Sequence, residues 1–209
     1  GFPQPTRHTI YDITWPSTLP ELRAAAADAF QHSADTMTAP GRSAIAGPNT
    51  DPTATGLQAV RDFAQDIERW PEAFDEPTLD VALKSLAAFI EKAGTGGGLF
   101  RHLLAQGCSD IGHQVDDPSL PPLAEAASHA ATAWTSLAAA GTRADTDTGA
   151  RWLAVTSAAQ RLPELEAILI DKLARAATAL TEPQHMRERH PQVCPHPWTA
   201  KSTTPTRSN

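Results

Sequence analysis

The sequence predicts an all-α protein, a helical bundle of five to six helices. Two observations indicate this fold class. Apolar residues recur every three or four positions through most of the chain, which is the spacing of one face of a helix. Proline and glycine separate one periodic segment from the next, as expected at helix ends.

A single short β-strand is predicted near the N-terminus. Residues 7–14, RHTIYDIT, alternate polar and apolar positions and contain β-branched and aromatic side chains. Because one strand alone is not stable, it needs a pairing partner. We therefore expect residues 1–17 to be the end of a further domain upstream. Alternatively, the strand pairs with a second copy of the chain in a homo-oligomer.

Residues 18–181 form the predicted helical domain. Ser17 or Thr18 can cap the first helix, and Pro71 is expected to stop the second. Pro163 lies inside the last periodic segment, where it predicts a kink or a break into two helices. The predicted helices span residues 18–37, 55–70, 76–93, 99–115, 119–141 and 150–180.

Residues 182–209 are predicted to be a disordered tail, because proline, serine, threonine, histidine and arginine replace the apolar stripe. The tail contains the metal-ligand types His185, His190, Cys194 and His196, but their spacing matches no structural zinc pattern. We therefore predict no metal site and no cofactor.

Charge and composition exclude several classes of partner. The net charge is −7 and the pI is about 5.5, which argues against nucleic acid and acidic membrane surfaces. No apolar run approaches the roughly 18 residues of a membrane helix, and no signal peptide is visible. Cys108 and Cys194 do not make a disulfide framework, so a cytoplasmic location is predicted.

The glycine run Gly94-Thr95-Gly96-Gly97-Gly98 is the strongest local signal for a functional site. It is not a P-loop, because Leu99 and Phe100 stand where lysine and a hydroxyl residue would follow. No strand precedes it, so it is not a dinucleotide fingerprint either. Two interpretations remain, namely a glycine turn whose backbone N–H groups hold an anion or oxyanion, and a tight corner between closely packed helices. The candidate substrate-binding residues are Glu91, Thr95, Gly96, Gly97, Gly98 and Arg101.

The segment IEKAGTGGGLFRHLLAQ, which begins at Ile90, resembles the signature of a known domain. That domain is the C-terminal part of proteins similar to butirosin biosynthesis protein H. The motif WPEAF, the tryptophan-containing stretch 134–137 and the final segment ELEAILIDKLA have counterparts there, so the resemblance covers roughly residues 5–180.

This resemblance implies a part in acyl transfer during natural-product biosynthesis. The named member moves an acyl group from an acyl-carrier protein to an amine of an aminoglycoside, and the presumed cysteine nucleophile lies in an N-terminal domain similar to cysteine peptidases. Neither Cys108 nor Cys194 matches that nucleophile, so we expect this chain to shape the pocket and to be inactive alone. The catalytic residues stay unassigned. The alternative is a non-catalytic helical module that binds a partner or self-associates.

Overall fold

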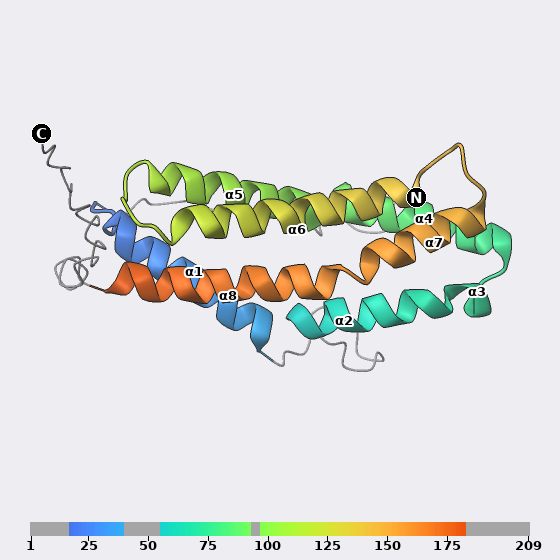
Figure 1. Ribbon diagram of the computed structural model, residues 1–209, viewed down its shortest axis with the longest axis horizontal. Helices are drawn as coiled ribbons and strands as arrows, with labels where there is room; N and C mark the ends of the chain where they lie inside the picture. The colour runs from blue at the N-terminus through green and yellow to red at the C-terminus, as the bar shows by residue number, and fades with distance from the viewer. Residues whose placement is uncertain (1–16, 40–54, 93–96, 183–209) are drawn as a thin grey trace, which may run out of the picture.

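The computed structural model describes residues 17–39, 55–92 and 97–182, and within these ranges the chain is an elongated bundle of helices (Figure 1). The all-α prediction is confirmed for this part of the protein, which contains no strand. The strand predicted at 7–14 and the tail predicted beyond residue 182 lie outside the described residues. The elements in chain order are α1 (Leu22–Thr38), α2 (Gly56–Asp66), the short 3₁₀ helix η1 (Ile67–Arg69), α3 (Trp70–Ala73), α4 (Glu76–Glu91), α5 (Gly97–Gly112), α6 (Leu120–Gly141), α7 (Thr148–Ala159) and α8 (Leu162–Thr181).

Helices α5 and α6 lie side by side as an antiparallel pair along one face of the bundle, and α8 runs beneath them (Figure 1). Alanine makes this close packing possible. Ala127, Ala130 and Ala131 of α6 are fully buried, and their small side chains let neighbouring helices approach. The antiparallel arrangement brings the first turn of α5 to the second half of α6. The last turn of α5 therefore lies at the beginning of α6.

Two hydrophobic clusters form the core, and α6 and α8 contribute to both. The first cluster joins α1 and the second half of α5 to α6 and α8, with Phe30, Cys108, Leu123 and Leu173 among its members. The second cluster lies at the other end of the bundle. It joins α2, η1, α4 and α7 to the second half of α6 and the start of α8, around residues such as Ile67, Leu83, Leu137, Val155 and Leu162.

Helix boundaries follow local sequence signals. Asp75 caps α4 by accepting a hydrogen bond of 3.0 Å from the backbone N–H of Thr78, and Pro77 lies in the first turn. The hydrogen bonds from the Thr78 side chain and backbone lower the pKa of Asp75. The predicted break near Pro163 is confirmed, because α7 ends at Ala159 and Pro163 lies in the first turn of α8.

The predicted end of the second helix is corrected by the structure. Helix α2 ends at Asp66, and Pro71 lies in the first turn of the short α3 instead of stopping a helix. Proline is well tolerated there, since its missing N–H has no acceptor in the first turn of a helix. Within the described part of the chain, no helix is both long and apolar enough to cross a bilayer.

Candidate functional site

The glycine run connects α4 to α5, and the structure describes its two ends. Glu91 is the last residue of α4 and is exposed, whereas Gly97 and Gly98 open α5 and are buried. Thr95 and Gly96 lie outside the described residues, so their predicted part in substrate binding stays a prediction.

Gly97 and Gly98 allow α5 to pack closely against α6. A Cβ at Gly97 would lie 3.0 Å from Cγ2 of Ile90 and 3.3 Å from the ring of Trp134. At Gly98 it would lie 2.3 Å from Oγ1 of Thr135 and 3.3 Å from the carbonyl oxygen of Ala131. Both approaches are shorter than a side chain tolerates without displacing its neighbours. These two glycines therefore have a packing role at the corner between the helices.

Glu91 lies at the amino end of α5. The Cβ position of Gly98 is 3.0 Å from Oε1 of Glu91, so this carboxylate lies against the first turn of α5. The amino end of a helix carries a partial positive charge that stabilises a carboxylate. The sequence suggested that an external anion could bind at the amino end of α5. The carboxylate of Glu91 supplies a negative charge at that position instead.

Arg101 points inward and belongs to a buried polar cluster that joins three helices. Its Nε donates to Oε1 of Glu166 on α8 at 2.5 Å, and its Nη1 donates to the carbonyl oxygen of Gly97 at 2.8 Å. Trp134 on α6 donates from Nε1 to the same Oε1 at 2.7 Å. The guanidinium carbon lies 5.2 Å from the centroid of the Trp134 ring, a cation–π arrangement.

Glu166 is the acceptor of this cluster and is buried. Its Oε1 receives two hydrogen bonds, whereas Oε2 is buried without a hydrogen-bond partner among the described residues. A buried carboxylate requires a cation beside it, and Arg101 supplies that cation. The cluster therefore fixes the first turns of α5 on α6 and α8, and Arg101 is engaged inside the protein.

Glu166 and Trp134 were not among the residues predicted for the site, although the sequence contains a signal for Glu166. Leu162, Leu169 and Leu173 are buried on one face of α8, and Glu166 occupies the position between them at the same helical spacing. A glutamate in an apolar register indicates a buried pair. Its partner could not be read from the sequence, because Arg101 is 65 residues away.

The outward face of the same turns of α5 is apolar. Leu99, Phe100 and Leu103 are 52%, 56% and 52% exposed, respectively. We call these three residues the α5 apolar face. The first turns of α5 therefore direct two buried glycines and the charged Arg101 toward the interior and expose large apolar side chains. A surface helix usually does the reverse, with apolar residues buried and charged residues exposed. Such a surface is typical of a binding site.

Cys108 has the properties of a core residue. It is 1% exposed, and burial raises the pKa of its thiol to about 11, so the thiolate required of a nucleophile is scarce. The described residues contain no group of three or more histidine, cysteine, aspartate or glutamate side chains that could hold a metal ion.

Residues 1–173 match the family model of a domain of unknown function, DUF4872. The chain belongs to this family. The matched region contains α1 to α7 and α8 as far as Leu173. It therefore includes Glu91, the glycine run, Arg101, Trp134 and Glu166. No curated protein and no solved structure matches the chain. The predicted kinship with butirosin biosynthesis protein H stays a prediction.

Proposed function

We propose that this chain is the C-terminal helical portion of an acyltransferase similar to butirosin biosynthesis protein H. In this proposal the domain shapes the pocket in which an acyl group passes from a carrier protein to an amine. The acyl group passes through the cysteine of the catalytic domain that the resemblance implies. Overall the C–S bond of the carrier thioester breaks, a C–N bond to the amine forms, and the proton that the amine nitrogen loses is taken up by the carrier sulfur, which leaves as the thiol.

The observation that carries this proposal is the α5 apolar face beside the glycine run. An acyl chain needs an apolar wall, and Leu99, Phe100 and Leu103 offer one that is open to a ligand or to another protein surface. The cluster of Arg101, Glu166 and Trp134 holds this wall in place from behind. A rigid support of this kind favours the precise positioning of a bound chain.

The reactive nucleophile comes from elsewhere in this proposal. Cys108 lies in the core and its pKa is raised to about 11, so it does not attack a thioester at neutral pH. The resemblance assigns the nucleophile to a domain similar to cysteine peptidases. The chain alone is then a pocket-forming unit without turnover.

The test is an acyl-transfer assay with the complete gene product and with this chain alone, using octanoyl and acetyl thioesters of a carrier protein. We expect transfer by the complete product and none by the chain alone. Phe100→Asp should lower kcat/KM for the octanoyl substrate by about tenfold or more, the value of burying one large apolar side chain, and should affect the acetyl substrate less.

The matched control is Leu153→Asp on α7, since Leu153 is 60% exposed and lies outside the α5 apolar face. This variant should keep the wild-type rates. Turnover by the chain alone would contradict the auxiliary role, and an unchanged octanoyl rate in Phe100→Asp would remove α5 from the pocket.

The second candidate function is a non-catalytic module that self-associates, and the same α5 apolar face favours it. Light scattering separates the two functions. Under this alternative the chain is an oligomer, Phe100→Asp makes it a monomer, and the complete gene product releases no thiol from the carrier thioester.

A further inference from the structure

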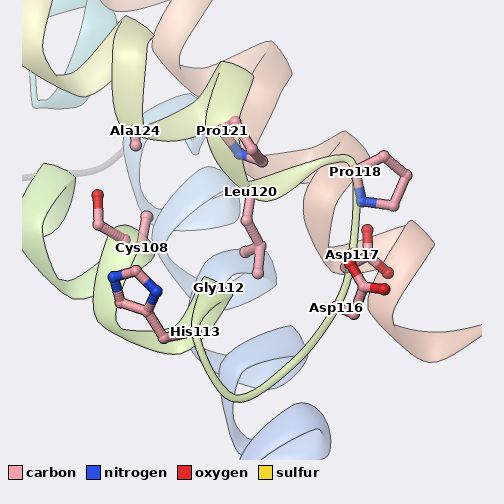
Figure 2. Close-up of a pocket in the computed structure, with 10 residues that line it drawn as sticks. Cys108, Gly112, His113, Asp116, Asp117, Pro118, Leu120, Pro121 and Ala124 are labelled. Carbon is pink, nitrogen blue, oxygen red and sulfur yellow. The ribbon is translucent and has the colours of Figure 1, made fainter.

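A second site lies at the opposite end of α5. A cavity of about 380 Å³ opens between the last turn of α5, the connection to α6 and the first turn of α6. Figure 2 shows residues of these three segments, among them His113, Asp116 and Pro121, arranged around it. The volume lies in the range of small-molecule sites. Gly112 follows Gly97 by fifteen positions, so the cavity is about 22 Å along the helix from the glycine run.

The floor of the cavity is apolar. Leu120 is buried, Ala124 is partly buried, and Cys108 adds a neutral thiol. Pro121 completes this surface from the first turn of α6. These groups suit a compact hydrocarbon body, and they offer it no charged partner.

The rim of the cavity carries excess negative charge. Asp116 is exposed there, and the carboxyl end of α5 adds the partial negative charge of a helix terminus. Asp117 is neutralised, because its Oδ2 accepts from Nη2 of Arg23 at 2.8 Å and its Oδ1 accepts from the hydroxyl of Ser119 at 2.7 Å. His113 is also exposed at the rim.

The amino end of α6 does not offset this charge in the usual way. Pro121 and Pro122 occupy its first turn, and proline has no backbone N–H. The first turn of α6 therefore lacks two of the donors with which a helix terminus binds anions. The electrostatics of the cavity favour a cation over an anion.

We propose that this cavity binds a small organic cation, a protonated amine carried on a compact apolar body. The ammonium group lies at Asp116 and the carboxyl end of α5, and the hydrocarbon body lies on Leu120 and Ala124. The inference is independent of the function proposed above, because it concerns the other end of α5 and is measured by binding.

Calorimetry or NMR titration of this chain with three probes of one shape tests the proposal. The probes are cyclohexylammonium, the neutral cyclohexanol and the anionic cyclohexanecarboxylate. We expect saturable binding of cyclohexylammonium about tenfold tighter than that of cyclohexanol, because the carboxylate and the helix terminus each contribute. Cyclohexanecarboxylate should bind most weakly of the three probes.

Two pairs of variants locate the site. Asp116→Asn should weaken cyclohexylammonium binding about two- to fivefold, while Asp110→Asn, an exposed aspartate of α5 outside the lining, should leave it unchanged. Gly112→Ala adds a methyl group to the lining at an ordinary contact of 3.9 Å from Leu120, so it should fold and weaken binding of every probe that enters. Gly107→Ala, with nothing within 4 Å of the new Cβ, is its control and should bind normally.

Some outcomes would overturn the proposal. These are the absence of saturable cyclohexylammonium binding, equal affinities for the three probes, and equal effects of the two aspartate variants. Wild-type binding by Gly112→Ala would place the ligand outside the cavity and would refute it as well.

Discussion

Replacing Arg101 with methionine should destabilise the protein strongly, because it removes the cation beside a fully buried carboxylate. Glu166 is buried, and the two donors to its Oε1 are Arg101 and Trp134. In Arg101→Met, of these two donors to the Glu166 carboxylate, the indole N–H of Trp134 remains. The methionine side chain keeps much of the volume, so the loss reports mainly on charge and hydrogen bonding.

The magnitude follows from the burial of both partners. The side chain of Arg101 is 18% exposed and that of Glu166 is 1% exposed. Removing one partner of a buried pair costs about 3–5 kcal/mol in the free energy of unfolding. For a protein of this size each kcal/mol lowers Tm by about 2–4 °C, so Arg101→Met should lower Tm by about 6–20 °C.

Urea unfolding followed by circular dichroism measures this loss, and two further variants make it specific. Arg101→Met/Glu166→Gln removes the buried charge and keeps an oxygen for Trp134, so it should recover at least about 2 kcal/mol. Arg175→Met breaks an exposed pair with Asp171 and should cost about 0.5 kcal/mol or less. If Arg101→Met costs no more than Arg175→Met, or if the double variant recovers nothing, the buried-pair argument is wrong.

Three further predictions concern single positions. Gly98→Ala should lower the free energy of unfolding by about 1–3 kcal/mol, because the new Cβ would lie 2.3 Å from a side-chain oxygen of α6. Gly107→Ala, where the new Cβ meets nothing within 4 Å, should raise it by about 0.5–1 kcal/mol. Urea unfolding of both variants checks this contrast. In a variant whose other cysteine is serine, Cys108 should react with a maleimide slowly in buffer and rapidly in urea, and equal rates followed by mass spectrometry would contradict its burial. The capping hydrogen bonds lower the pKa of Asp75 below its ordinary value of 3.8, so they stabilise the fold at neutral pH and are lost as the pH falls through that lowered pKa. Asp75→Asn should therefore reduce the acid-side slope of stability against pH, and an unchanged slope would exclude this contribution.

Helix positions could be predicted from the sequence because the signals that set them are local. The spacing of apolar residues predicts each helical face, and Pro163 predicts the break between α7 and α8. The end of α2 at Asp66 was missed, because the apolar pattern continues through η1 and Trp70 after the α-helix has ended. The strand predicted at 7–14 stays a prediction.

The glycine run was recognised as unusual from composition alone, but its two interpretations could not be separated there. Whether Gly97 and Gly98 face a ligand or a neighbouring helix depends on what lies opposite, and the structure places Trp134 and Thr135 opposite them. Ligand contact by Thr95 and Gly96 stays a prediction. Glu91 was predicted with the site, and the structure adds that its carboxylate lies against the first turn of α5.

The helices of the described residues, the acidic charge and the place where glycine interrupts the helices could be predicted from the sequence, because these properties depend on composition or on residues close together in the chain. The packing of the helices against one another shows which side of α5 is buried, which residue neutralises Glu166 and where the cavity opens. Each of these features joins residues from different helices. No local pattern specifies such contacts, because they form when helices pack against one another and remove their apolar surfaces from water.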